Sequence, residues 1–255
     1  MSNYAVMPLN DYVNTCEAIR EKTETTELIK SGEMADKITD VFNAGKKSEY
    51  DRFWDEFQQN GERTSYMQGF RGAWWNDKTF YPKYDIIAVG NASIIFGSVT
   101  ITNLRKRLAE CGVTLDTSQA TNLSEAFAYQ PYNEEFPVID TSSANSLTYL
   151  FTNAYKAKRI EKLILKADGS QVFANTSFSN NYVLEDIEIE GTIGTNIWFQ
   201  SCSKLTVDSM NNIISCLKDY SETTTTHTLT LHADAKARLS ESEIAVATQK
   251  GWTIA

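Results

Sequence analysis

A repeat of 24 residues in the middle of the chain constrains the fold more than any other feature of the sequence. Thr-Leu-Asp-Thr-Ser at 114–118 returns as Val-Ile-Asp-Thr-Ser at 138–142. Three further pairs keep the same spacing: Ala120 and Ala144, Leu123 and Leu147, and Phe127 and Phe151. One unit of this length cannot bury an apolar face by itself, so successive units must stack to form a shared core. The repeat therefore predicts a solenoid of stacked coils.

Short strips that alternate apolar and polar residues recur along the second half of the chain. They are Lys-Leu-Ile-Leu-Lys (162–166), Asp-Ile-Glu-Ile-Glu (186–190), Lys-Leu-Thr-Val-Asp (204–208) and Thr-Leu-Thr-Leu-His (228–232). Such alternation turns one set of side chains inward and the other outward, as in a β-strand. We expect one strand per coil and a core ladder in which Leu115, Ile139, Leu163 and Ile187 are equivalent. The recurring Phe residues should point inward beneath the strands: Phe127, Phe151, Phe173 and Phe199.

The first 80 residues lack the repeat and favour short amphipathic helices, at about 11–22, 34–42 and 47–60. An aromatic-rich stretch follows, with Trp74, Trp75, Tyr81 and Tyr84. These rings are suited to a carbohydrate or partner platform. The alternative, which we favour, is that they cover the open end of the first coil, since repeat arrays need atypical caps. We therefore predict a helical attachment or cap region at 1–80 and a repeat region at 81–255.

The repeat region also contains two predicted helices. The segment 209–220 places Ile213, Cys216, Leu217 and Tyr220 on one side of a helix. Ser-Glu-Ser-Glu at 240–243 is a capping-box pattern that begins a second helix. Gly251 should end that helix, and Trp252 should fold back as a lid. The fold class expected is α+β: short N-terminal helices, an irregular β-solenoid and a helical C-terminal cap.

Several units resemble the BspA-type bacterial leucine-rich repeat, in which Phe, a small or Cys residue and then Leu precede a short strand. The resemblance is carried by 126–130 (Ala-Phe-Ala-Tyr-Gln), 150–154 (Leu-Phe-Thr-Asn-Ala) and 199–205 (Phe-Gln-Ser-Cys-Ser-Lys-Leu). The segment 18–38 looks like a leader of phage or prophage tail-associated structural proteins. Together these similarities imply protein or glycan recognition, or a virion or cell-surface role, with no catalytic residues. Cys stands in the Phe–Leu turn only at Cys202, which departs from the family pattern.

Charge and hydropathy narrow the classes of partner. The chain has 24 basic and 33 acidic residues and a net charge of −9, so a nucleic acid would be repelled. The basic runs at 105–107 and 156–159 are short and should be solvated. Neither a secretory signal peptide nor a membrane span of about 18 apolar residues is predicted. We expect a virion-associated protein, or one that lies in the bacterial cytoplasm before assembly. The alternative is a location on the cell surface, if an export signal has been removed.

The sequence contains no recognisable catalytic or metal-binding motif. The GxSxG, P-loop, dinucleotide and HExxH patterns are absent. Four cysteines form no CxxC pair and only two histidines occur, which disfavours a zinc site. A Cys–His dyad would need Cys202 or Cys216, and both thiols are expected to be buried. We therefore expect a protein that is not an enzyme and that has no cofactor.

One outward-facing acidic column is a candidate binding surface. The repeat spacing places Asp116, Asp140 and Glu188 at equivalent positions, with Glu190 and Asp208 just beyond. Such a column suits calcium or a basic partner surface. The favoured alternative is a solvated sheet face whose charge prevents association. The second candidate surface is the pair Trp74 and Trp75.

These observations predict a non-enzymatic interaction or structural protein, of the kind found in phage or prophage tails. Its repeat surface would bind a protein or glycan ligand, and its N-terminal helices would mediate homo-oligomer or virion contacts. One alternative is a bacterial cell-surface leucine-rich-repeat protein that binds a host protein or glycan. A second is a glycan-cleaving depolymerase, for which no particular carboxylate pair stands out.

Overall fold

A computed structural model describes residues 76–78, 80–82, 85–93 and 95–255. The chain divides into two compact units, Met1–Asp55 and Glu56–Ala255, and every residue described lies in the second unit. The helices predicted within 1–80 therefore fall almost wholly outside the described residues, as do Trp74, Trp75 and Tyr84.

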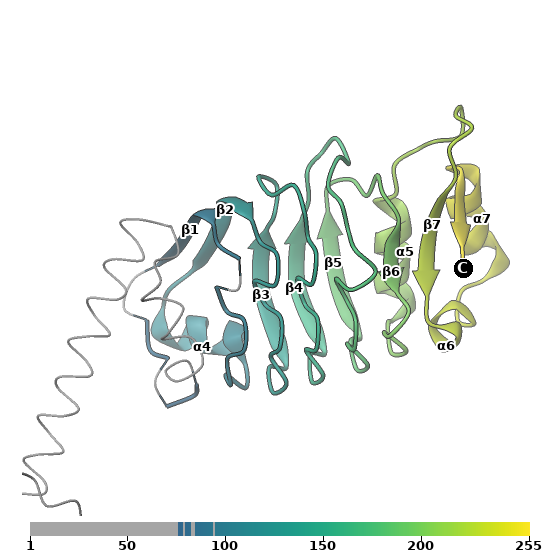
Figure 1. The fold of residues 1–255 in the computed structure, drawn as a ribbon. Coiled ribbons are helices and arrows are strands. Elements are labelled where there is room, and N and C mark those ends of the chain that lie inside the picture. The colour runs from purple at the N-terminus through teal and green to yellow at the C-terminus, as the bar shows by residue number, and fades with distance from the viewer. Residues whose placement is uncertain (1–75, 79, 83–84, 94) are drawn as a thin grey trace, which may run out of the picture. The chain divides into compact units, whose positions relative to one another are not determined.

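The second unit is an α/β structure with three small parallel sheets (Figure 1). Its strands are β1 (Ile86–Asn91), β2 (Leu115–Asn122), β3 (Glu135–Asp140), β4 (Arg159–Ile164), β5 (Asp186–Glu190), β6 (Ile197–Phe199), β7 (His227–Leu231) and β8 (Trp252–Ile254). Its helices are α4 (Leu104–Cys111), α5 (Val207–Ser215), α6 (Ala233–Lys236) and α7 (Glu241–Gln249). The sheets are β1–β2, β3–β4–β5 and β6–β7–β8. Because all of these pairings are parallel, the class differs from the predicted α+β.

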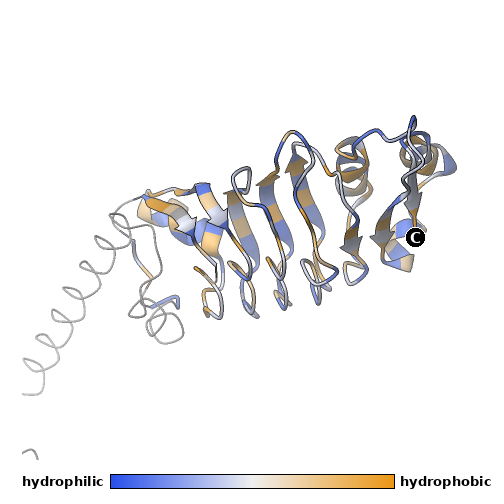
Figure 2. Ribbon diagram, turned by 45° about the horizontal axis from the view of Figure 1, so that its top comes forward, coloured by the Kyte–Doolittle hydropathy of each residue, from blue (hydrophilic) through white to orange (hydrophobic). Residues whose placement is uncertain are grey.

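The predicted 24-residue step is present between β3 and β4, where Ile139 pairs with Leu163. The step from β4 to β5 is different, because the register shifts between Ile160 and Leu163. Leu163 consequently pairs with Ile189 rather than with Ile187, which pairs with Ile160. The expected ladder is thus wrong by two residues at β5. Ile139, Leu163, Ile187 and Ile189 are buried, whereas Leu115 is only half-buried. Figure 2 shows the alternation of apolar and polar residues along β3, β4 and β5.

The repeated Asp-Thr-Ser sequence links β2 to β3 and β3 to β4 through hydrogen bonds. Although β2 and β3 belong to different sheets, the Thr117 hydroxyl donates to Asp140 O at 2.7 Å and accepts from the Asp140 N–H at 2.9 Å. One unit later the Thr141 hydroxyl donates to Ile164 O at 2.7 Å. The recurrence of Thr is therefore explained by hydrogen bonding between neighbouring coils.

The strip 204–208 is not the predicted strand; it forms a turn and the first residues of α5. The Thr206 hydroxyl accepts from the Ser209 N–H and caps the helix. Asp208 lies in the first helical turn, where a carboxylate interacts favourably with the helix dipole. Helix formation removes Val207 from the expected ladder and leaves it half-buried.

The helix α5 lies beside β5, and its side chains replace the hydrogen bonds that a neighbouring strand would provide. The Asn212 carboxamide accepts from the Ile189 N–H at 2.7 Å and donates to Ile189 O at 3.1 Å. The Ser209 hydroxyl accepts from the Ile187 N–H at 3.0 Å. Because Ser209 and Asn212 are three residues apart, both lie on the helix face that meets β5.

Five buried phenylalanines form a continuous stack: Phe96, Phe127, Phe151, Phe178 and Phe199. Their neighbouring ring centroids are 5.5, 5.8, 5.7 and 4.4 Å apart in that order. The inward direction predicted for the recurring Phe residues is confirmed. However, the ring stacked on Phe151 is that of Phe178, whereas Phe173 packs against Phe178 from another position.

A column of buried side chains follows three residues after these stacked rings and includes Gln130, Ala154, Asn181 and Cys202. The Gln130 carboxamide donates to Phe96 O at 2.8 Å and accepts from Asn133 Nδ2 at 2.9 Å. By contrast, neither carboxamide atom of Asn181 has a hydrogen-bond partner among the residues that the structure describes. A buried amide without partners destabilises the fold by its desolvation cost.

Replacement of Asn181 by Cys, the residue at the same place in the next coil, should raise the free energy of unfolding by about 1–3 kcal/mol, because it removes this unpaired amide. Urea denaturation of the two proteins measures the difference. The matched control is Gln130→Leu, which should be destabilising because it removes a carboxamide with satisfied hydrogen bonds. A loss of stability in Asn181→Cys would contradict the prediction.

The C-terminal helix α7 confirms the predicted capping box: the Ser240 hydroxyl accepts from the Glu243 N–H, and Glu243 reaches back to the Ser240 N–H. Gly251 follows the helix with a φ of 80°, a conformation that favours glycine. Trp252 is buried, but as the first residue of β8 rather than as a separate lid. Its indole N–H donates to Lys218 O at 2.8 Å.

The helix predicted over 209–220 ends earlier than expected, at Ser215. Tyr220 lies beyond it, with its ring centroid 4.3 Å from that of His227. None of the helices in the described ranges is long and apolar enough to cross a membrane.

Candidate binding groove

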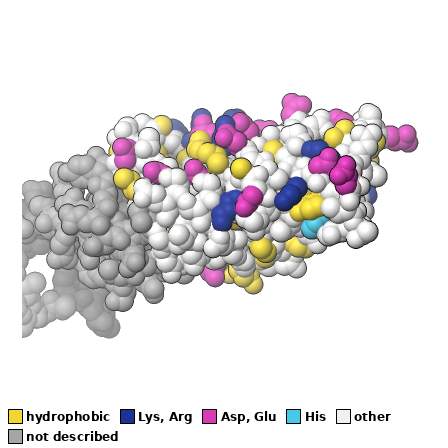
Figure 3. Space-filling model, turned by 90° about the horizontal axis from the view of Figure 1, so that it is seen from above, with side chains coloured by type: hydrophobic (Ala, Val, Ile, Leu, Met, Phe, Trp, Pro, Cys, Tyr) yellow, Lys and Arg dark blue, Asp and Glu magenta, His cyan; other side chains and the backbone are white. Residues whose placement is uncertain are grey.

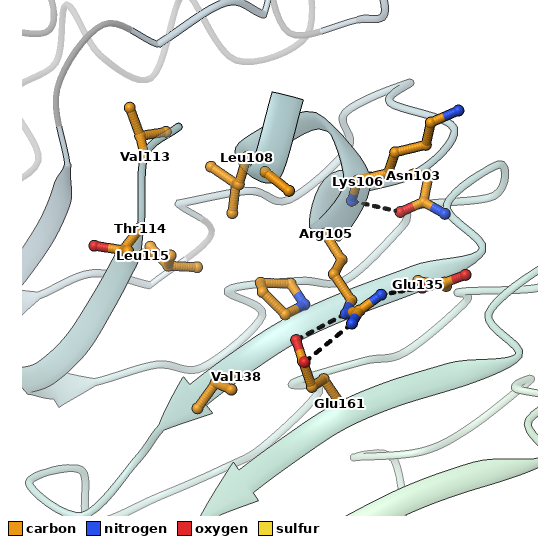
Figure 4. Close-up of a pocket in the computed structure, with 12 residues that line it drawn as sticks. Asn103, Arg105, Lys106, Leu108, Val113, Thr114, Leu115, Glu135, Val138 and Glu161 are labelled. Atoms are coloured by element: carbon orange, nitrogen blue, oxygen red, sulfur yellow. Dashed lines mark hydrogen bonds and ion pairs between the residues drawn. The ribbon is translucent and has the colours of Figure 1, made fainter. Parts of the chain in front are cut away.

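An open groove of about 620 Å³ lies between α4 and the outer side of β3 and β4 (Figure 4). Its apolar lining comes from Leu108, Ala109, Val113, Leu115, Pro137 and Val138. Four charged residues line it. Arg105, Glu135 and Glu161 lie at the side of the groove nearest β4, and the ammonium of Lys106 lies 3.8 Å from Glu110. The groove therefore combines an apolar surface with a charged cluster.

The helix that forms one wall of the groove has local signals that our reading of the sequence missed. The Asn103 side chain accepts from the Lys106 N–H at 2.8 Å and caps the first turn. Gly112, with a φ of 66°, ends the helix. Leu104 and Leu108, one turn apart, are both buried beneath it. The two cap residues and the spacing of the two leucines together are sufficient to predict α4, although most of the other residues in the helix are charged.

Arg105 joins two strands through its guanidinium. It binds both carboxylate oxygens of Glu161, at 2.8 and 3.1 Å, and one of Glu135 at 3.1 Å. The hydrogen bonds that Arg105 donates to Glu161 lower the pKa of Glu161 and raise the pKa of Arg105. The three side chains remain 33–40% exposed. The cluster is therefore accessible from the groove.

The basic run 105–107 was predicted to be solvated, and this is wrong for Arg107. Arg105 is held by the two glutamates, and the Arg107 side chain is only 12% exposed. Arg107 Nη1 donates to Asp77 O at 2.8 Å and to Phe80 O at 3.2 Å. Lys106 alone is largely exposed, at 70%. Tertiary contacts thus give two of these cations structural roles.

A second hollow of about 290 Å³ lies where α5 meets the same outer side of the sheet. Its charged lining comprises Arg159, Glu161, Asp186, Glu188 and Asp208. Because Glu161 lines both hollows, they adjoin across the outer face of β3–β5, between α4 and α5. In Figure 3, acidic and basic side chains lie interspersed along the upper edge of the described part.

The predicted acidic column is divided between different roles. The carboxylates of Asp116 and Asp140 close local turns by accepting the N–H of Ser118 at 2.9 Å and of Ser142 at 2.8 Å. Asp140 pairs with Ile164, which in turn pairs with Glu190. The shifted register therefore aligns Asp140 with Glu190 rather than with Glu188.

The other acidic residues of the column lie nearer to α5. Lys162 binds Glu188 at 2.9 Å and Glu190 at 3.0 Å, and these hydrogen bonds raise the pKa of Lys162. Asp208 lines the second hollow from the first turn of α5. Across the described ranges, no group of three His, Cys, Asp or Glu side chains is placed to hold a metal ion. Trp74 and Trp75 fall outside those ranges.

Cys202 and Cys216, the two thiols considered for a Cys–His dyad, are both withdrawn from solvent. Cys202 is fully buried beneath the coil, and burial raises the pKa of its thiol. Cys216 is half-buried at the end of α5, where its Sγ donates to Ile189 O at 3.2 Å. Burial also raises the pKa of this thiol. A raised pKa disfavours the thiolate that a nucleophile requires.

Comparison with known protein families finds none that matches the chain. Comparison with curated proteins and with solved structures likewise finds no match.

Replacement of Glu161 by Gln should lower the melting temperature at neutral pH, with a loss of at most about 1 kcal/mol because the ion pair is partly exposed. Arg105 lowers the pKa of Glu161 below its usual 4.5, so the stabilisation is present above that value. It is lost as the pH falls through the lowered pKa. Thermal unfolding of both proteins across this range should show the difference closing. The exposed loop variant Glu222→Gln is the control, and a gap that persists in acid would contradict this account.

Proposed function

We propose that this chain is a non-enzymatic interaction or structural protein built on a leucine-rich-repeat-like solenoid. Three observations support the solenoid: the 24-residue pairing of β3 with β4, the continuous stack of buried phenylalanines and the Thr hydroxyls that join successive coils. Each feature extends from one coil to the next, as expected for units that bury their apolar faces against neighbours.

The observation that carries the proposed function is the pair of adjoining hollows on the outer face of β3–β5. Helices α4 and α5 bound this face, and Val138 is 38% exposed within it. A concave surface with exposed apolar side chains and a few charged groups is suited to binding. The outer face of β3–β5 is thus our proposed partner-binding surface.

Site-specific photocrosslinking in the cell that encodes the chain tests this proposal. A benzophenone amino acid in place of Val138 should give a discrete adduct with a second molecule. The matched control is the same substitution at Val172, an exposed valine (51%) that does not line either hollow. No adduct at Val138, or equal adducts at both positions, would contradict the proposal.

The resemblance to tail-associated proteins leads us to propose a virion as the setting. Mass spectrometry of particles purified from the encoding strain should then detect the chain in a constant ratio to the major tail proteins. Its absence from purified particles, together with its accessibility to surface biotinylation of intact cells, would instead favour the cell-surface alternative.

A further inference from the structure

We propose that the groove beneath α4 binds an extended, basic segment of a partner protein. An apolar side chain of the segment contacts Val138, and a Lys or Arg side chain contacts Glu135 and Glu161. This inference rests on the proposed function and specifies the chemistry of the partner.

The apolar part of the groove is open to an incoming side chain. Val138 lies on β3 and is 38% exposed. Ala109, on the facing side of α4, is exposed and has only a methyl group. Leu115, which is half-buried, and Pro137, which is buried, also line the groove. Burial of an apolar side chain against these residues gains about 25 cal/mol per Å² of area removed from water.

The charged part of the groove favours a cation. The Arg105 guanidinium carries one positive charge and binds the two negative charges of Glu135 and Glu161, so these three side chains retain one negative charge. Lys106 also lines the groove, but its ammonium lies 3.8 Å from the carboxylate of Glu110, which offsets its charge. Three of the Arg105 N–H groups already point at these carboxylates. An incoming anion would therefore meet the glutamates without a free guanidinium, whereas a cation is attracted by the remaining carboxylate charge.

The adjoining hollow has the same charge preference. Besides the shared Glu161, it is lined by three carboxylates, Asp186, Glu188 and Asp208, and by one basic residue, Arg159. Glu188 is paired with Lys162 at 2.9 Å, so Asp186 and Asp208 supply the excess negative charge. A segment that runs from the first hollow into the second passes Glu161 and then meets these carboxylates. This continuity favours an extended segment with more than one basic residue over a single anchoring side chain.

Fluorescence anisotropy with synthetic peptides tests the proposal on the full chain. The probe is a fluorescein-labelled dodecapeptide in which Val and Arg alternate, each separated by Ser. One control peptide replaces every Arg with Glu, and the other replaces every Val with Ser. The basic apolar probe should bind at least about tenfold more tightly than either control, a difference of about 1.4 kcal/mol. Equal binding of the probe and the Ser control would overturn the apolar contact.

Two variants locate the binding in the groove. Ala109→Trp should fill the groove mouth and weaken probe binding at least about tenfold, as expected on loss of a central contact. Ala237→Trp is the matched control, at an exposed alanine after α6, and should leave binding unchanged. If the probe binds both variants with equal affinity, its attraction to the acidic chain is non-specific, and the proposal is overturned.

The double variant Glu135→Gln with Glu161→Gln tests the charge preference. It leaves Arg105 without its two carboxylates, while the carboxylates of the adjoining hollow remain, so the difference in affinity between the peptide with Arg and the peptide with Glu should become smaller. Circular dichroism establishes that each variant is folded at the assay temperature. If Val138 forms its adduct but the peptides show no preference for Arg, the proposed function stands and this inference fails. If Val138 forms no adduct and the peptides show no preference for Arg, the proposed function and this inference both fail.

Discussion

Replacement of Phe151 by Ala is expected to lower the free energy of unfolding by about 3–5 kcal/mol, because a buried aromatic ring is lost and a cavity remains. The Phe151 side chain has no exposed surface. Its ring lies 5.8 Å from that of Phe127, 5.0 Å from Phe136 and 5.7 Å from Phe178. Since these rings come from three successive coils, the loss affects the interfaces on both sides. Guanidinium denaturation followed by far-ultraviolet circular dichroism measures the change.

Tyr155→Ala is the matched control, because Tyr155 is an aromatic residue of the same coil that is 42% exposed. It stacks on Tyr182 at 6.3 Å but on the surface, so the expected loss is at most about 1 kcal/mol. Equal losses in the two variants would show that the Phe stack is not the centre of the core.

Replacement of Asn212 by Ala should cost about 2–4 kcal/mol, because the Ile189 N–H loses its partner and Ile189 O loses one of its two. The carboxamide bonds to these groups are 2.7 and 3.1 Å long. Cys216 Sγ still contacts Ile189 O at 3.2 Å, so the loss arises mainly at the N–H. Hydrogen exchange measured by NMR should show faster exchange of the Ile189 amide, together with a lower denaturation midpoint.

Ser215→Ala provides the comparison within the same helix. Ser215 is exposed, and its hydroxyl donates only to a helix carbonyl, that of Asn212 at 2.7 Å, apart from a long contact with Cys216. Its replacement should change stability by less than about 0.5 kcal/mol. Unchanged exchange at Ile189 in Asn212→Ala would contradict the role assigned to the carboxamide.

The repeat was visible in the sequence because identical physical requirements recur in each coil. Phe fills the core and Thr bonds the neighbouring strand, so Phe127 and Thr117 return 24 residues later as Phe151 and Thr141. The strip 204–208 shows the limit of this reasoning. It alternates like a strand, yet the cap at Thr206 and the side chains of Ser209 and Asn212 make a helix the better neighbour for β5. Alternation over five residues does not distinguish these outcomes.

The candidate groove was less accessible to prediction. The caps of α4 lie in the local sequence, at Asn103 and Gly112, and were recognisable in principle. The ion pairs were not, because Arg105 is 30 residues from Glu135 and 56 from Glu161. The acidic column expected from a constant spacing was misaligned by the single register shift between β4 and β5.

By itself, the sequence determined the inward-facing phenylalanines, the capping box of α7 and the negative charge of the chain, since each depends on residue type and short-range spacing. Only the tertiary structure decided which coils pair with a shifted register, where a helix replaces a strand, and which charges meet on the outer face of β3–β5. Those outcomes depend on contacts between residues distant in the chain, whose energies no local pattern contains.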